Sequence, residues 1–163
     1  MGDNNKNNGL VYLTRERLVE LEHELHEMKL HGRAEMARKI AEARGHGDLS
    51  ENAEYDAAKE EQQHFESRIA RLEHTLSRAR IMESKELPND KVYILSKVKL
   101  KDLKTNEIVY YILVSPEEAD FERGKISVTS PLGRGLMGKT EGQSATIAVP
   151  AGTLEYEILE LSR

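Results

Sequence analysis

The chain has 163 residues, a net charge of −5, and 33% charged against 38% hydrophobic residues. It contains no cysteine, which excludes disulfides, thiolate zinc sites and a cysteine nucleophile. The acidic balance argues against non-specific nucleic-acid binding through counterion release, and the high charge content favours an elongated helical element over one large core.

Residues 1–9 are polar and rich in Asn, and they lack the apolar stretch of a signal peptide. No run of the sequence approaches the ~18 apolar residues that a membrane span needs. We therefore expect a disordered tail at residues 1–9 and a cytoplasmic protein that does not enter a membrane.

A helical pattern begins after Thr14, which is placed as its N-cap. Its apolar positions come in steps of three and four: Leu18, Leu21, Leu25 and Met28. This heptad spacing predicts a narrow coiled-coil seam. After Met28 the steps lengthen to four through Gly32, Met36 and Ile40, which predicts local unwinding or a bend near Gly32.

A second helical pattern is more regular than the first. Its seam positions are Tyr55, Ala58, Gln62, Phe65, Ile69, Leu72, Leu76 and Ala79. When the two patterns are paired, the numbers of facing residues, such as Leu25 with Leu72, add to 97 or 98. A constant value indicates an antiparallel hairpin, and half of it falls at Asp48–Leu49. We predict a coiled-coil arm at residues 10–84, roughly 45 Å long at 1.5 Å per residue, with its tip at 45–51.

The remainder of the chain predicts a small β-sheet domain at residues 85–163. Pro88 stops any helix, and from Val92 the hydrophobic period is two. Expected strands are 98–101, 107–114, 125–129, 146–149 and 153–161. Ser130 and Pro131 are placed as the N-cap and first residue of a short helix that ends near Met137. The fold class is therefore α+β, with a helical hairpin followed by an antiparallel sheet that carries one helix.

Asp48 and Glu51 stand three residues apart at the predicted tip. One interpretation is a capping box, in which Asp48 caps the following helix and Glu51 reaches back to its amide. The other is that the two carboxylates offer oxygen ligands to a hard cation such as Mg²⁺. Since Mg²⁺ is bound by six ligands, the two carboxylates would complete a site whose other ligands come from another molecule. Both interpretations can hold together.

Other polar clusters in the arm have simpler explanations. The six histidines are His23, His26, His31, His46, His64 and His74, and none is arranged with others in a zinc pattern. Four cations lie along the distal part of the first helix: Arg33, Arg38, Lys39 and Arg44. They are either a solvated face of the helix or a positive strip that guides the arm past phosphates. Tyr55 and Phe65 are expected in the seam.

The tip and the second domain resemble the Gre family of bacterial transcript-cleavage factors. At the tip the similarity covers Gly47-Asp48-Leu49-Ser50-Glu51-Asn52-Ala53-Glu54-Tyr55 and Ala57-Ala58-Lys59-Glu60, and in the second domain it covers Gly124 to Lys139. In all, the resemblance spans about residues 10–163. The acidic total favours the GreA branch of the family over the GreB branch. Gly135, Met137 and Asp56 depart from the commonest family pattern, and we expect them to affect docking at most.

The resemblance implies a fold and a function. The second domain would be FKBP-like without isomerase activity and would dock on RNA polymerase, while the arm enters the polymerase's secondary channel. Asp48 and Glu51 would help hold a Mg²⁺ ion at the polymerase's own active site, with Ser50 and Asn52 supporting water or RNA contacts. The backtracked RNA 3′ end would then be hydrolysed. The protein would be a monomeric accessory factor with no cofactor of its own.

Two other functions stay open at this point. A related channel-binding regulator could inhibit polymerase without inducing cleavage, although the intact sequence from Asp48 to Asn52 argues against it. A plain coiled coil could pair with a second copy of itself. The internal pairing of the two helical patterns counts against that possibility, because the seam is satisfied within one chain.

Overall fold

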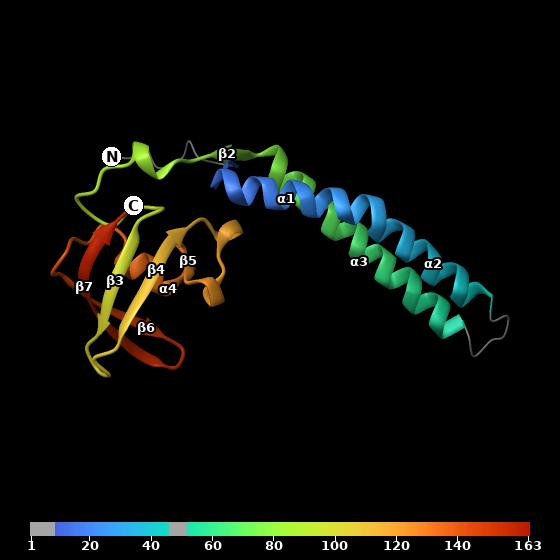
Figure 1. The fold of residues 1–163 in the computed structure, drawn as a ribbon. Coiled ribbons are helices and arrows are strands. Elements are labelled where there is room, and N and C mark those ends of the chain that lie inside the picture. The colour runs from blue at the N-terminus through green and yellow to red at the C-terminus, as the bar shows by residue number, and fades with distance from the viewer. Residues whose placement is uncertain (1–8, 46–51) are drawn as a thin grey trace. The chain divides into compact units, whose positions relative to one another are not determined.

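The computed structural model describes residues 9–45 and 52–163 (Figure 1). The chain divides into two compact units. The first is built on Glu16–Ala79, and the second contains Val11–Arg15 together with Arg80–Arg163. The predicted disorder of the N-terminal tail and the predicted tip fall largely on residues outside this description. In the described part of the chain, no helix has the length and apolar character to span a membrane.

The first unit is the predicted helical hairpin. Its elements are α1 (Arg15–Glu27), the π-helical segment η1 (Met28–Gly32), α2 (Arg33–Arg44) and α3 (Asn52–Ser77). Every predicted seam position from Leu18 to Ala79 is buried or half-buried, and Ile69 is only 1% exposed. The alternating steps of three and four therefore predicted the inner face correctly. Charged residues cover the outside, as expected for two helices that bury a single seam.

In the described part of the hairpin, four ion pairs join its two sides. They are Glu24–Arg68, Lys29–Glu73, Arg33–Glu66 and Lys39–Glu61. From Lys29 to Lys39 the partners step back along α3 from Glu73 to Glu61, as the predicted antiparallel pairing requires. All of these side chains are at least 37% exposed, so the pairs contribute little and the buried seam supplies most of the stability.

The predicted unwinding near Gly32 is confirmed, because Met28–Gly32 forms a π-helical turn. Such a turn accommodates the extra residues of the lengthened steps. Gly32 has ordinary helical angles, with φ −64° and ψ −43°, so it is not required for its backbone conformation. It is required for space: a Cβ atom there would lie 2.2 Å from Cζ of Phe65.

Gly32→Ala is therefore expected to lower the melting temperature of the arm in the wild-type background, by overpacking that costs about 1–3 kcal/mol. In a Phe65→Leu background the same change is expected to raise the melting temperature, because the clash is gone and Ala favours a helix by about 1 kcal/mol over Gly. Circular dichroism at 222 nm measures both. Equal effects in the two backgrounds would contradict the proposed contact.

The second unit is a five-stranded sheet. Its strands are β3 (Lys97–Asp102), β4 (Ile108–Val114), β5 (Lys125–Ser127), β6 (Ser144–Val149) and β7 (Gly152–Ser162), in the order β5-β4-β3-β7-β6. All neighbours are antiparallel except β4 and β5, which run parallel. The parallel pair departs from the predicted antiparallel sheet. It arises because the segment after Val114 crosses over through two 3₁₀ turns, η4 (Pro116–Glu118) and η5 (Phe121–Arg123).

The core of the second unit lies between one face of the sheet and α4 (Pro131–Leu136). Leu100, Leu113, Leu136 and Ile158 are fully buried there. The predicted cap of α4 is confirmed, because the hydroxyl of Ser130 accepts a hydrogen bond from the backbone N–H of Gly133 at 3.0 Å.

A two-stranded sheet that the sequence patterns did not reveal stands where the hairpin begins and ends. It pairs β1 (Val11–Leu13) with β2 (Ala79–Ile81). Val11 and Leu13 are 2% and 1% exposed, and the carbonyl of Leu13 accepts a hydrogen bond from the N–H of Met82 at 2.9 Å. The second helical pattern therefore ends at Ser77, two residues before the predicted last position, Ala79.

Candidate functional site

The acidic pair lies in the segment that joins α2 to α3. Helix α2 ends at Arg44, where the N–H of Gly45 bonds the carbonyls of Ala41 and Glu42, and α3 begins at Asn52. Asp48, Ser50 and Glu51 lie outside the described residues, as does His46, and so does the side chain of Asn52. Their expected roles therefore stay predictions, but the two helices on either side are those that the pairing of the patterns placed there.

The last described turn before this segment is held by a contact between the helices. Nη2 of Arg44 donates to the hydroxyl of Tyr55 at 3.3 Å, and its guanidinium lies 5.5 Å from the centre of the tyrosine ring. This combines a hydrogen bond with a cation–π contact. Tyr55 is half-buried, as the seam prediction requires. The ends of α2 and α3 are thus fixed to each other where the acid-bearing segment leaves and returns.

The other three cations of the predicted positive strip are paired with acids of the arm. Arg33 makes two hydrogen bonds of 2.9 Å to Glu66, and Lys39 bonds Glu61 at 2.5 Å. Arg38 bonds both Glu35 and Glu42 at 2.6 Å. Hydrogen bonding by Glu66 raises the pKa of Arg33, and bonding by Glu35 raises that of Arg38. A phosphate that approached this face would have to compete with these carboxylates.

These ion pairs make the stability of the arm depend on pH, in a direction that follows from the pKa shifts of the two acids. The hydrogen bond from Arg38 lowers the pKa of Glu35 below its ordinary value of 4.5, and the bond from Arg33 does the same for Glu66. The unfolded chain then binds more protons than the folded one as the carboxylates titrate. The stabilisation is present above the unfolded pKa and is lost as the pH falls through the folded pKa.

We therefore expect the melting temperature of the arm, followed at 222 nm, to fall as the pH drops below 4.5. The melting temperature of a Glu35→Gln/Glu66→Gln variant should fall less over the same pH range, because its amides do not titrate. The difference should shrink in high salt, since both pairs are exposed. An identical pH dependence in wild type and variant would refute the assignment.

The prediction that the histidines lie on the surface of the helices is confirmed for those that the structure describes. His23, His26, His31, His64 and His74 are all exposed. Among residues 9–45 and 52–163, no group of three His, Cys, Asp or Glu side chains is placed to hold a metal ion.

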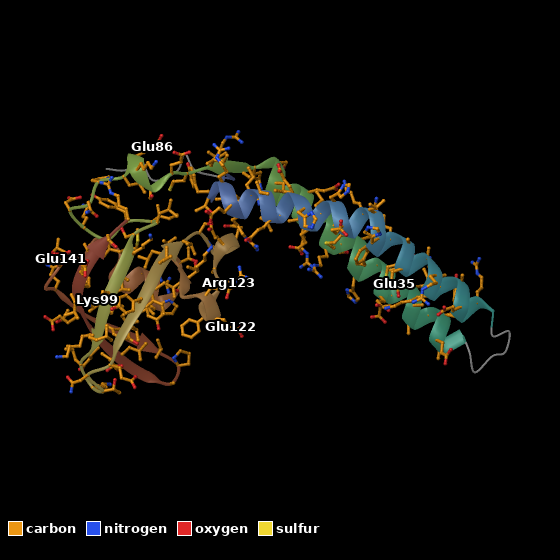
Figure 2. All side chains as sticks on the ribbon, in the orientation of Figure 1. Glu35, Glu86, Lys99, Glu122, Arg123 and Glu141 are labelled. Atoms are coloured by element: carbon orange, nitrogen blue, oxygen red, sulfur yellow. The ribbon has the colours of Figure 1, made fainter. Side chains whose placement is uncertain are left out.

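The second unit presents an open groove of about 290 Å³ across β7, β3 and β4, on the sheet face away from the core. Its lining includes Lys97, Lys99, Tyr110, Arg123 and Glu160. Nζ of Lys99 lies 5.9 Å from the ring centre of Tyr110, which is 66% exposed. Lys99 and Arg123 are marked in Figure 2. Arginine and aromatic side chains are enriched in protein interfaces.

Two of the three departures from the commonest family pattern lie on or next to α4. A Cβ atom on Gly135 would lie 2.5 Å from Cγ1 of Ile147, so glycine allows α4 to approach β6 closely. Met137 follows the helix and is 37% exposed. The third, Asp56, is exposed on α3. Their expected effect on docking stays a prediction.

The helical hairpin and the small α+β unit that follows it each match a described protein family. Residues 11–81 match the family described as "Transcription elongation factor, N-terminal", and residues 87–163 match "Transcription elongation factor, GreA/GreB, C-term". The chain belongs to the GreA/GreB family of transcription elongation factors.

Relatives of similar sequence agree with this family. The "Transcription elongation factor GreA" of Chlorobium phaeobacteroides is 57% identical over 94% of this chain and 98% of its own length. The protein of the same name from Chlorobaculum tepidum is 53% identical over 93% of this chain and 96% of its own. The GreA factor homolog 1 protein of Thermus thermophilus has a structure that aligns with 29% identity over 94% of this chain and 99% of that chain, at a TM-score of 0.43. The names of the first two relatives agree with the predicted GreA branch.

Proposed function

We propose that this protein stimulates the hydrolysis of backtracked RNA by RNA polymerase, acting as an accessory factor and not as an enzyme. The arm enters the polymerase's secondary channel, and the second unit docks on the polymerase. The observation that carries the proposal is the location of Asp48 and Glu51 in the segment between two helices whose seam positions, from Leu18 to Ala43 and from Tyr55 to Leu76, are all buried or half-buried. Such an arm supplies reach of roughly 45 Å.

Two carboxylates suit a shared metal better than a metal of their own. Mg²⁺ prefers six oxygen ligands and keeps several waters, so Asp48 and Glu51 would hold it only together with ligands of the polymerase. When bound, the ion supplies charge stabilisation to the attacking and leaving oxygens of a phosphoryl displacement. The residues of this chain bind and orient, with Ser50 and Asn52 in supporting contacts to water or to the RNA 3′ end. The protein would hold no cofactor alone, act as a monomer and reside in the cytoplasm.

The proposal is tested with stalled, backtracked elongation complexes and Mg²⁺. Addition of the protein should shorten the nascent RNA from its 3′ end and allow elongation to resume on addition of nucleotides. An inhibitor of the same family would instead slow elongation and leave the RNA at full length. That second outcome would overturn the proposal.

The arm cations Arg33, Arg38, Lys39 and Arg44 fit this function mainly as structural groups. Arg33, Lys39 and Arg44 bond residues of the opposite helix, which supports a role in keeping the helices together. Arg38 bonds acids of its own helix. Contact with RNA or the channel is the remaining part of the proposal. Exchanging the partners of one pair, as in Arg33→Glu/Glu66→Arg, keeps the pair but moves the charges. If the exchanged variant cleaves like wild type, the cations act within the arm alone.

A further inference from the structure

The groove on the outer face of the sheet is lined by neighbouring rows of charged and aromatic side chains. Lys97 and Lys99 form the middle row on β3, where they alternate with buried apolar residues. Strand β4 places Tyr110 opposite Lys99, and β7 places Glu160 opposite it on the other side. Together with Arg123, the described lining has three cations and one acid, although the whole chain has a net charge of −5.

The two lysines of the groove keep their positive charge uncompensated. Among the ion pairs of residues 9–45 and 52–163, none includes Lys97 or Lys99. Nζ of Lys99 lies 5.9 Å from the ring centre of Tyr110, and that tyrosine is 66% exposed. A cation beside an open aromatic ring is the combination with which proteins bind single-stranded nucleic acids, since the cation attracts a phosphate and the ring stacks on a base.

The third cation, Arg123, is held by the turn that carries it. Its side chain is 68% exposed, and Nε lies 3.5 Å from the carboxylate of Asp120. The same carboxylate accepts the backbone N–H of Arg123 at 3.3 Å. The backbones of Asp120 and Lys125 bond each other in both directions, at 2.9 and 2.8 Å. Gly124 has φ +70°, a conformation that suits glycine, so the turn is preformed.

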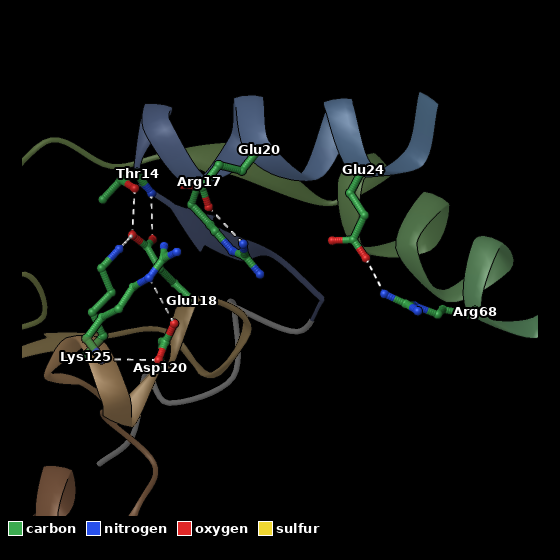
Figure 3. A network of polar contacts seen from close by, with 9 residues as sticks. Thr14, Arg17, Glu20, Glu24, Arg68, Glu118, Asp120 and Lys125 are labelled. Atoms are coloured by element: carbon green, nitrogen blue, oxygen red, sulfur yellow. Dashed lines mark hydrogen bonds and ion pairs between the residues drawn. The ribbon is translucent and has the colours of Figure 1, made fainter. Parts of the chain in front are cut away.

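This turn is anchored inside the second unit by Glu118, whose side chain is only 2% exposed. Three donors converge on its carboxylate (Figure 3). Oε1 accepts from Nζ of Lys125 at 3.2 Å and from the Thr14 hydroxyl at 2.7 Å, and Oε2 accepts from the Thr14 N–H at 3.0 Å. A carboxylate accepts at both oxygens, so it suits three donors in a buried place. Lys125 is therefore used within the fold, in contrast to the two lysines of the groove.

We propose that this groove binds single-stranded RNA. The phosphates pair with Lys97, Lys99 and Arg123, and one base stacks on the ring of Tyr110. The choice of RNA rests on the proposed function, in which the transcript is the nucleic acid that the factor meets. Two of the three cations are lysines, which are depleted in protein interfaces but bind phosphate well as point charges. RNA-recognition modules likewise stack bases on aromatic side chains of a sheet.

The binding should be modest and should depend on salt. Non-specific binding of nucleic acids typically has a Kd of about 10⁻⁴ to 10⁻⁶ M. Each phosphate contact of a single strand contributes about −0.7 to the slope of log affinity against log salt, so three contacts predict a slope of about −2. Because the chain as a whole is acidic, the attraction is confined to the groove.

The test measures the fluorescence anisotropy of a labelled single-stranded RNA of about eight nucleotides as the full-length protein is added. Lys99→Gln is expected to weaken binding and to reduce the slope from about −2 to about −1.4. Lys91→Gln should leave both the affinity and the slope unchanged. It is the matched control, because Nζ of Lys91 also lies over a tyrosine ring, 5.4 Å from the centre of Tyr93, but outside the groove.

Substitutions of Tyr110 and Glu160 test the stacking and the charge separately. Tyr110→Leu should weaken binding at least about fivefold, whereas Tyr110→Phe should stay within about twofold of wild type, because only Phe keeps a ring on which a base can stack. Glu160→Gln should tighten binding at least about twofold, because it removes the negative charge that repels phosphate in the groove. A gain of affinity of this kind cannot result from misfolding.

The inference would be overturned if wild type showed no saturation at about 1 mM protein, or if Lys99→Gln or Tyr110→Leu bound the RNA like wild type. Tighter binding of an oligoglutamate peptide of the same length would also overturn it, because the groove would then fit an acidic protein segment. Failure of the proposed function would look different: wild-type protein would bind the RNA oligonucleotide and still leave the RNA of stalled complexes at full length.

Discussion

Asp48→Asn is expected to lower the rate of stimulated RNA cleavage by about 100-fold or more, with Glu51→Gln acting in the same direction. The reason is that a metal ion contributes several kcal/mol to the stabilisation of a phosphoryl-transfer transition state, and each 1.36 kcal/mol is tenfold in rate. An amide is a weaker ligand than a carboxylate for Mg²⁺. Polymerase affinity should be nearly unchanged, because we propose that the second unit is the part that docks.

These two substitutions also separate the capping interpretation from the metal interpretation. Asn caps a helix as well as Asp, and Gln can replace Glu in a capping box. The helix start is therefore preserved while the charge at the metal is lost. If capping were the whole purpose of the pair, both variants would cleave like wild type. Truncation to Ala would not make this distinction, because it removes the cap as well.

The measurement is the cleavage rate in stalled complexes as a function of Mg²⁺ concentration. Loss of a metal ligand should raise the Mg²⁺ concentration needed for half-maximal cleavage, so that excess Mg²⁺ partly restores the rate. Asp56→Asn is the matched control, since Asp56 is an exposed acid in the first turns of α3 and outside the pair. Full cleavage by the Asp48→Asn/Glu51→Gln double variant would remove the basis of the proposal.

Gly133→Ala is expected to destabilise the second unit by about 2–3 kcal/mol, which corresponds to a melting temperature lower by roughly 10 °C. A Cβ atom at this position would lie 2.0 Å from the carbonyl oxygen of Ser127 and 2.9 Å from its carbonyl carbon. Both are backbone atoms beside strand β5, so relief requires α4 or the sheet edge to move. Thermal unfolding followed by near-ultraviolet circular dichroism of the tyrosines measures the change.

Gly135→Ala, two residues further along α4, provides the comparison. There the added atom would meet the side chain of Ile147 at 2.5 Å, and a side chain can turn away more cheaply than a backbone can shift. We expect a smaller loss of stability than for Gly133→Ala. A larger effect at Gly135 than at Gly133 would show that the packing of α4 on the sheet edge is not the controlling contact.

The sequence was most informative where a pattern repeats. The spacing of the apolar residues in the two helical patterns predicted the seam, the hairpin and the local unwinding near Gly32. It could do so because the helix period and helix packing are regular. The cap of α4 at Ser130 was predictable for the same reason, since it depends on adjacent residues. The pairing of the patterns also predicted Asp48 and Glu51 at the tip, between the two helices, and that position of the acids stays a prediction.

Contacts between distant segments could not be predicted in this way. Nothing in Ser115-Pro116-Glu117-Glu118 indicates which of the two acids is buried, because the donors that make burial tolerable come from Thr14 and Lys125. The parallel pairing of β5 with β4 depends on the path of the crossover, and three-residue strands such as β1 and β2 are too short to show a period. Arg33 and Lys39 looked available in sequence because their partners, Glu66 and Glu61, lie on the other helix.

The bond between Thr14 and Glu118 has a consequence for synthesis of the chain. Residues 11–15 leave the ribosome before their partner, which follows 104 residues later, about 5–20 s at ordinary rates of translation. The hairpin is complete at residue 79 and can fold in the meantime. Once formed, it brings the segments before α1 and after α3 together and removes most of the long loop whose closure would oppose the bond. The folded arm therefore keeps the segment before α1 close to the segment after α3 until Glu118 has been made.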